Sequence, residues 1–140
     1  MIIYTIIPAR GGSKSIPRKN IRKLNGVPLI KYSIDYSLKS KYIDRTIVST
    51  DDEEIAEIAL ECGAEVPFIR PSKYAEDLTQ DFAVLNHAML RCQEIYKEVA
   101  DLFILLRPTS PLRPDNLIEE SIDLLIKNPE STSVRAVAKA

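Results

Sequence analysis

Basic side chains surround two adjacent glycines in the stretch IPARGGSKSIPRKN, which spans residues 7–20. Lysine and arginine side chains beside glycines, whose backbone N–H groups can converge on one point, are suited to binding the phosphates of a nucleotide. Gly11 and Gly12 can adopt positive φ angles and turn their N–H groups toward such an anion, with the Ser13 hydroxyl as a further donor. The cations of the stretch are Arg10, Lys14, Arg18 and Lys19.

The charge of the whole chain is close to neutral, at −1, but it is unevenly distributed. Residues 1–34 carry seven basic side chains and no acidic one, whereas the rest of the chain carries 12 basic and 20 acidic side chains. This asymmetry favours an anionic partner, although a solvated basic loop remains an alternative. The stretch matches neither G-x-x-x-x-G-K-[ST] nor G-x-G-x-x-G, so it is neither a Walker P-loop nor a dinucleotide-binding fingerprint.

Alternating strands and helices are expected to position this loop. Short apolar or β-branched runs predict strands at residues 2–7, 45–50, 64–70 and 101–106, with a further strand beginning in 131–140. Helical spacing predicts helices at residues 28–38, from Asp51 or Asp52 to Cys62, at 81–99 and at 115–127, with Gly63 ending the second. The fold class is therefore α/β, in three layers, with a mostly parallel sheet and helices on both faces.

Ligands of open α/β sheets bind beyond the carboxyl ends of the strands. This rule places three loops at one edge of the sheet, namely residues 9–20, 70–81 and 107–113. The Ser-Thr-Asp-Asp run at 49–52 is also suggestive of a metal site, but a capping role at a strand-to-helix junction is better supported. His87 lies off the apolar stripe of its helix, so we expect it at the surface or flank and not as a ligand.

The composition, with 45% hydrophobic and 28% charged residues over 140 positions, is that of one globular domain. Cys62 and Cys92 have no metal-type spacing and are expected to be core thiols in a reducing cytosol. A single histidine excludes a histidine-rich metal site. No apolar run approaches roughly 20 residues, and no basic segment precedes the first apolar stretch. We therefore expect a cytoplasmic protein that binds neither a membrane nor nucleic acid.

Four segments together resemble the acylneuraminate cytidylyltransferases, a CMP-sialic acid synthetase-like family. They are IPARGGSKSIPRKN, IVSTDDEEIAEIA, FIRPSKYAED and RPTSPLR, which follow in this order over nearly the whole chain. The resemblance implies a Rossmann-like nucleotidyltransferase that transfers CMP from CTP to a nine-carbon acidic sugar and releases pyrophosphate. The acid would be of the sialic, legionaminic or pseudaminic type.

The resemblance also implies roles for individual residues. Lys19 would neutralise charge at the reacting phosphate, and Arg10 would contact phosphate and nucleotide. The residues that would bind CTP or the sugar are Ala9, Gly11, Gly12, Ser13, Lys14, Asn20, Arg70, Thr79, Asp81, Arg107, Thr109 and Ser110. Asp81 and Arg107 depart from the family's usual small hydroxyl residue and glutamine, and Arg113 is better explained as a brace of its loop.

Simpler explanations stay open for several of these residues. A turn residue is the alternative interpretation of Asn20, and an ion pair at the rim is the alternative for Arg70. Lys14 and Lys19 are alternatively solubilising charges.

Members of this family are longer than 140 residues, so residues 1–140 are expected to form an incomplete nucleotide-binding domain. The resemblance implies a homodimer and Mg²⁺, with no metal ligand in this chain because the aspartates that hold the ion lie in the missing C-terminal part. This piece alone would then have little turnover.

Two other functions compete with this interpretation. One is 3-deoxy-manno-octulosonate cytidylyltransferase, which RPTSPLR disfavours because that branch carries an acidic motif there. The other is a non-catalytic nucleotide-binding fragment.

Overall fold

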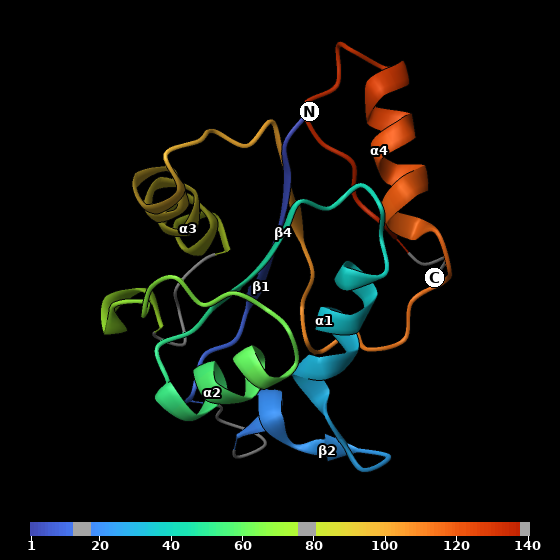
Figure 1. The fold of residues 1–140 in the computed structure, drawn as a ribbon. Coiled ribbons are helices and arrows are strands. Elements are labelled where there is room, and N and C mark those ends of the chain that lie inside the picture. Colours follow the sequence, from blue (N-terminus) through green and yellow to red (C-terminus); the bar gives the residue numbers. More distant parts are fainter. Residues whose placement is uncertain (13–17, 76–80, 138–140) are drawn as a thin grey trace.

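The computed structural model describes residues 1–12, 18–75 and 81–137 (Figure 1). Its strands are β1 (Ile3–Pro8), β2 (Lys23–Leu24), β3 (Val27–Pro28), β4 (Arg45–Ser49) and β5 (Leu102–Leu105). Its α-helices are α1 (Leu29–Leu38), α2 (Glu53–Glu61), α3 (Asp81–Tyr96) and α4 (Leu117–Lys127). Two short 3₁₀ helices, η1 (Lys19–Ile21) and η2 (Ser72–Tyr74), lie in the loops. The alternation of strands and helices confirms the expected α/β class.

The central sheet consists of three parallel strands in the order β4-β1-β5. At its centre, Thr5 of β1 lies opposite Thr46 of β4 and Ile104 of β5. Consecutive parallel strands need crossover connections, and these contain α1 between β1 and β4, and α2 and α3 between β4 and β5. Because all three strands run in the same direction, the loops that follow them meet at one edge of the sheet.

Helices cover both faces of this sheet (Figure 1). Successive side chains of a strand point to opposite faces, so Ile6 packs with α3 while Ile7 packs with α1, α2 and α4. Ala88 and Cys92 of α3 complete the first cluster. The second cluster is larger and contains Ile3, Ile7, Ala9, Ile30, Ile34, Val48, Ile55, Ala59, Ala64, Leu106, Ile118 and Ile122. The three-layer prediction is therefore confirmed.

Two expected strands are absent from the described residues. Residues 64–70 make a single isolated bridge to β4, between Glu65 and Ile47. It consists of the hydrogen bonds from Glu65 N to the Thr46 carbonyl at 2.8 Å and from Val48 N to the Glu65 carbonyl at 2.9 Å. Pro67 has no N–H to donate, which prevents a regular ladder beyond this point. Residues 131–137 form no regular element and are exposed. The prediction of five strands in the parallel sheet was therefore wrong for the described ranges, where this sheet has three, and residues 138–140 lie outside them.

A two-stranded hairpin, β2–β3, was not predicted. It pairs Leu24 with Val27 around a two-residue turn in which Asn25 and Gly26 both have positive φ, 53° and 78°. This is the type I′ geometry that an Asn-Gly pair favours, because both residues tolerate the left-handed region. The signal was present in the sequence and would have identified the turn.

The helix ends follow the capping signals with small shifts. Asp52 caps α2 by accepting from Ile55 N at 3.0 Å, and Gly63, with a φ of 98°, follows the helix as expected. Pro28 precedes α1 as its N-cap instead of entering the first turn, and α3 ends at Tyr96, three residues earlier than predicted. Within the described ranges, no helix combines the length and the apolar character needed to cross a bilayer.

Candidate nucleotide-binding site

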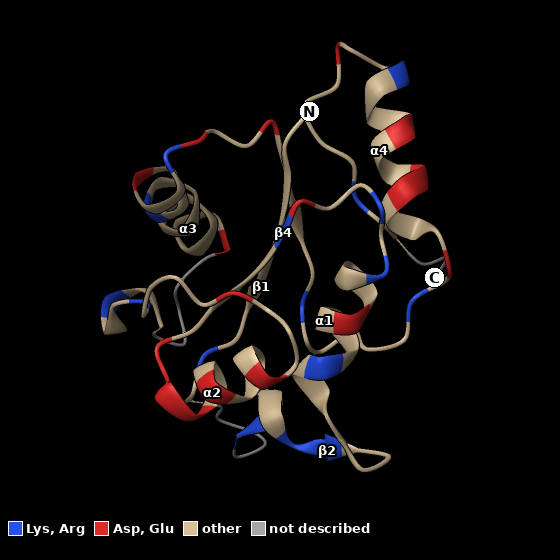
Figure 2. Ribbon diagram, viewed as in Figure 1, with Lys and Arg blue, Asp and Glu red and all other residues tan. Residues whose placement is uncertain are grey.

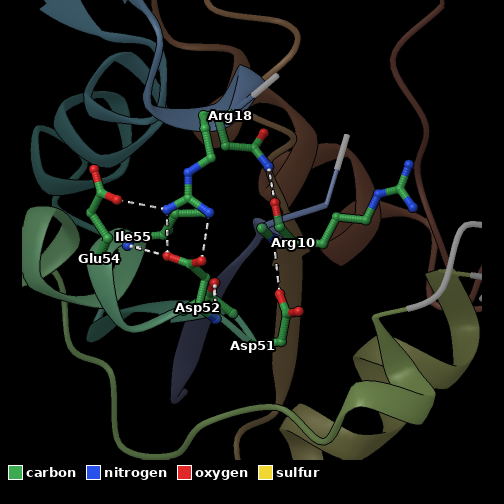
Figure 3. Close-up of polar contacts among 9 residues, drawn as sticks. Arg10, Arg18, Asp51, Asp52, Glu54 and Ile55 are labelled. Atoms are coloured by element: carbon green, nitrogen blue, oxygen red, sulfur yellow. Dashed lines mark hydrogen bonds and ion pairs between the residues drawn. The ribbon is translucent and has the colours of Figure 1, made fainter. Parts of the chain in front are cut away.

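The loop that follows β1 begins at the carboxyl edge of the sheet. Ala9 is buried, and its N–H donates to the Ser49 carbonyl at 2.9 Å, which extends the pairing of β1 with β4 by one residue. Arg10 is half-buried, and its guanidinium points away from the neighbouring acidic residues (Figure 3). Ser13 and Lys14 lie outside the described residues. The expected phosphate loop is thus placed where ligands of α/β sheets bind.

Gly11 is close to two consecutive acidic residues at the β4–α2 junction. Its N–H donates to Asp51 Oδ1 at 2.8 Å, and a Cβ at this position would lie only 2.8 Å from Asp52 Oδ2. Neither Gly11 nor Gly12 is among the residues with positive φ, so the predicted reason for the glycines was wrong. Gly11 is required by the close approach of Asp52 and not by a left-handed backbone.

Arg18, at the other end of the loop, is paired with Asp52 (Figure 3). Arg18 Nη1 and Nη2 donate to the two carboxylate oxygens of Asp52 at 2.6 and 2.8 Å, and Nη2 also contacts Glu54 at 2.9 Å. The hydrogen bonds that Arg18 donates to Asp52 raise the pKa of Arg18, and they are also the main cause that lowers the pKa of the Asp52 carboxyl. The loop is therefore held at both ends by the acidic residues that precede α2.

This acidic clamp, formed by Asp51 and Asp52, was missed by the sequence analysis. Capping by Asp52 was expected and is confirmed, but the contacts with Gly11 and Arg18 join segments more than 30 residues apart. Figure 2 shows the basic residues near β2 beside the acidic start of α2. The sequence did offer a signal for this clamp, since two consecutive acidic residues follow the strand expected beside the basic loop.

Asn20 closes the base of the loop from inside. Its side chain is buried and Nδ2 donates to the Arg10 carbonyl at 2.9 Å. Lys19, the preceding residue, starts η1 and is half-buried. Asn20 therefore connects the beginning of the loop to its end. This structural role is compatible both with a contact to the nucleotide and with a turn residue, the two explanations given above.

Arg70 is buried behind the loop, with a relative exposure of 4%. Its Nη1 donates to the Tyr74 carbonyl at 2.9 Å and its Nη2 to the Ser49 carbonyl at 3.4 Å, whereas its Nε has no hydrogen-bond partner among the described residues. Burial lowers the pKa of Arg70, Asp51 opposes this shift, and Arg10 adds to it. The alternative of an exposed ion pair at the rim was wrong. Arg70 is a buried cation close to the loop after β1.

Arg107 and Asp81 form an ion pair that connects the loop after β5 with the start of α3. Arg113 braces this loop as expected, because its Nη1 donates to Ser33 Oγ at 3.0 Å and its Nη2 to the Arg107 carbonyl at 2.8 Å. Burial lowers the pKa of Arg113. Thr109 and Ser110 are exposed on the same loop, and Thr79 lies outside the described residues.

His87 packs against two aromatic side chains. Its ring stacks at an angle on Tyr74, with centroids 5.0 Å apart, and meets the edge of Phe68 at 5.1 Å. Nδ1 is buried without a hydrogen-bond partner among the described residues, and burial lowers the pKa of the ring. His87 is therefore half-buried at the flank of the helix, one of the two positions expected, because residues 68–75 fold over this part of α3.

The described residues contain no cluster of three or more histidine, cysteine or acidic side chains that would hold a metal ion. Asp51 and Asp52 accept hydrogen bonds from Gly11 and Arg18, and the acidic clamp supplies two carboxylates without a third ligand beside them among the described residues. The residues described here do not fit a Mg²⁺ site, and the location of metal ligands elsewhere stays a prediction.

Comparisons with known proteins identify the family of the chain. A family model described as "Cytidylyltransferase" matches residues 4–139. Over 126 residues the chain is 43% identical to the pseudaminic acid cytidylyltransferase of Campylobacter jejuni, covering 88% of this chain and 53% of that protein. It is 37% identical over 127 residues to the CMP-N,N'-diacetyllegionaminic acid synthase of Legionella pneumophila, covering 89% and 53%.

A solved structure shares the fold. It is CMP:2-keto-3-deoxy-manno-octonic acid synthetase complexed with CTP, which superposes with a TM-score of 0.76 at 22% identity, over 92% of this chain and 49% of that one. The chain thus spans about half the length of the curated relatives it matches. From the family match over most of its length and the identity to these relatives, we conclude that the chain belongs to the cytidylyltransferase family.

Proposed function

We propose that the protein transfers CMP from CTP to a nine-carbon acidic sugar of the pseudaminic, legionaminic or sialic acid type and releases pyrophosphate. The observation that carries this proposal is the basic glycine loop held at the carboxyl edge of the sheet by Asp51 and Asp52. Relatives 43% and 37% identical carry the names pseudaminic acid cytidylyltransferase and CMP-N,N'-diacetyllegionaminic acid synthase, which supports the class of sugar.

The chemistry follows from the charges of the loop. The anomeric hydroxyl of the sugar attacks the α-phosphorus of CTP and forms an O–P bond. The bond from the α-phosphorus to the oxygen that bridges to the β-phosphorus breaks, pyrophosphate leaves with that oxygen, and the hydroxyl proton passes to water. Negative charge increases on the non-bridging and leaving oxygens during this step. Arg10 and Lys19 would neutralise it, and the acidic clamp would position both by fixing the ends of the loop.

The remaining predicted residues divide between the two substrates. Arg70 is buried beside Arg10 and Asp51, where it would contact the nucleotide, and Asp81 would line the same pocket. Thr109 and Ser110, exposed after β5, would face the sugar. Mg²⁺ would supply further charge neutralisation, but no step is assigned to it because the described residues do not assemble its site.

Octulosonate activation is the competing enzymatic function. The structural likeness to a synthetase of this class, at 22% identity, supports the fold alone. The loop RPTSPLR at residues 107–113 carries no acidic residue, which favours the nine-carbon acids.

We further propose a cytoplasmic homodimer whose partners are CTP and the sugar acid, without a nucleic acid or a membrane. Light scattering of the intact protein tests the dimer.

Lys19→Ala tests the enzymatic role of the loop. Removing one charge that stabilises the transition state costs on the order of 10²–10³ in rate, so we expect pyrophosphate release from CTP and sugar acid to fall by this factor. Lys23→Ala is the matched control, since it removes an exposed lysine four residues away in β2. Equal turnover of the two variants would contradict the assignment of Lys19. Calorimetric titration with CTP, ATP and GTP separates an enzyme selective for CTP from a non-catalytic nucleotide-binding module.

A further inference from the structure

The ion pair between Arg107 and Asp81 crosses the carboxyl edge of the sheet. Arg107 Nη2 contacts Asp81 Oδ2, and about half of each side chain is exposed, 51% for Arg107 and 45% for Asp81. Asp81 begins α3, which covers one face of the sheet, whereas the Arg107 backbone is bonded to Ser33 of α1 on the other face. The pair therefore joins the two outer layers over the end of β5.

The backbone of Arg107 is held more firmly than its side chain. Its carbonyl accepts from Ser33 Oγ at 3.2 Å and from Arg113 Nη2 at 2.8 Å. The residues on either side, Leu106 and Pro108, are buried. The guanidinium thus extends from a fixed base, while among the described residues its one ion-pair partner is the half-exposed Asp81.

Other arginines of this edge are bound more completely. Arg18 contacts two carboxylates through three hydrogen bonds, and Arg113 and Arg70 are fixed to backbone carbonyls. A half-exposed pair such as that of Arg107 contributes less than about fivefold to an equilibrium constant. Another carboxylate can therefore replace Asp81 at little cost.

We propose that Arg107 binds the carboxylate of the acidic sugar, and that Asp81 holds the guanidinium in place until this carboxylate replaces it. The inference rests on the proposed function. A sugar carboxylate has the charge and the planar geometry of the Asp81 side chain, and an arginine can bind it through two parallel N–H···O bonds. The strand order β4-β1-β5 puts Arg107 on the side of the β1 loop opposite to the acidic clamp. The nucleotide phosphates would then lie over β1 and β4, and the acid over β1 and β5.

The two partners of the pair should have opposite effects on binding. Arg107→Gln removes the guanidinium and should weaken binding of the sugar acid on the order of 10–100-fold, the range of a hydrogen bond to a charged group. Asp81→Asn removes the competing carboxylate and should strengthen binding by up to about fivefold. A pair that only braced the two loops would shift both variants in the same direction.

The experiment is calorimetric titration of the intact protein with N-acetylneuraminic, N,N'-diacetyllegionaminic and pseudaminic acid, each compared with its methyl ester, in the presence of a non-hydrolysable CTP analogue. The variants are Arg107→Gln and Asp81→Asn. Arg91→Gln is the matched control, because among the described residues Arg91 likewise has one ion-pair partner, the exposed Glu94, but lies on α3. We expect the wild type to prefer at least one acid to its ester, Arg107→Gln to lose this preference, Asp81→Asn to increase it and Arg91→Gln to keep it.

The inference is overturned if Arg107→Gln retains the acid-to-ester preference, if both variants weaken binding of the acid, or if ester and acid bind the wild type equally. Pyrophosphate release with CTP is measured in parallel. If no pyrophosphate is released but the protein prefers the acid to its ester in a way that depends on Arg107, the proposed function is refuted and the assignment of Arg107 is supported. If pyrophosphate is released but the preference for the acid does not depend on Arg107, this inference alone is refuted. If none of the acids binds, both the proposed function and this inference are refuted.

Discussion

Gly11→Ala tests the acidic clamp directly. A Cβ at Gly11 would lie 2.8 Å from Asp52 Oδ2 and 2.9 Å from Asp52 Cβ, distances that real Cβ atoms do not tolerate. Asp52 cannot move away freely, because Arg18 binds its carboxylate at 2.6 Å and Ile55 N donates to it at 3.0 Å. The added methyl group must therefore displace the loop after β1 or break the pair with Arg18.

The expected cost combines two effects. Inserting a methyl group into a filled space costs about 1–3 kcal/mol, and loss of a partly exposed ion pair adds up to about 1 kcal/mol. We expect the free energy of unfolding to fall by about 2 kcal/mol, which corresponds to a melting temperature about 6 °C lower for a domain of this size. Since the loop carries Arg10 and Lys19, CTP affinity should fall by roughly tenfold, which corresponds to about 1.4 kcal/mol.

Urea unfolding and calorimetric titration with CTP measure both effects. Gly12→Ala is the control for stability, because no described atom lies within 4 Å of a Cβ at that position. In the background of Asp52→Ala, the cost of Gly11→Ala should be smaller but not abolished, since the carboxylate is gone while the Cβ of residue 52 remains. The reasoning is refuted if Gly11→Ala and Gly12→Ala destabilise equally, or if the costs of Gly11→Ala and Asp52→Ala are additive.

Three further predictions use the pKa shifts. Arg18 holds the pKa of the Asp52 carboxyl below its ordinary 3.8, so this group stabilises the fold above about pH 4 and the stabilisation is lost as the pH falls through the lowered value. Asp52→Asn, which keeps the cap, should therefore lower stability by about 1 kcal/mol at pH 7 and flatten its acid dependence in urea unfolding at pH 7 to 3. Burial lowers the pKa of His87 below its ordinary 6.5. At lower pH the folded protein therefore binds fewer protons at this ring than the unfolded chain does, and its stability decreases as the pH falls through 6.5. His87→Phe, which keeps a ring against Tyr74, should reduce the loss of thermal stability between pH 7 and 5. Burial raises the pKa of Cys92 to about 11, so this thiol should resist alkylation at pH 8 in the folded protein and react after unfolding.

Each of these predictions has a contrary outcome. If the free energy of unfolding of Asp52→Asn depended on pH between 7 and 3 as that of the wild type does, the pair with Arg18 would not contribute to stability. A steeper pH dependence in His87→Phe would contradict a buried neutral ring. Rapid labelling of Cys92 in the native protein, located by mass spectrometry with Cys62 as the internal comparison, would contradict its burial.

Features set by neighbouring residues could be predicted from the sequence. The α/β alternation, the cap at Asp52, the stop at Gly63 and the position of the basic loop after β1 follow from periodicity and local hydrogen bonding. The Asn25-Gly26 turn was equally readable, although it was overlooked. The strand expected at residues 64–70 failed because β propensity does not report whether a neighbour is available for pairing, and Pro67 interrupts the ladder.

The sequence by itself determined the class of fold, the family, and the loop that carries the positive charge. Only the tertiary structure decided what surrounds that loop. Gly11 meets Asp52, Arg18 pairs with Asp52, and Arg107 reaches Asp81 because the crossover connections and the strand register bring together segments 26 to 41 residues apart. Such contacts depend on the packing of whole elements, which no local pattern of residues contains.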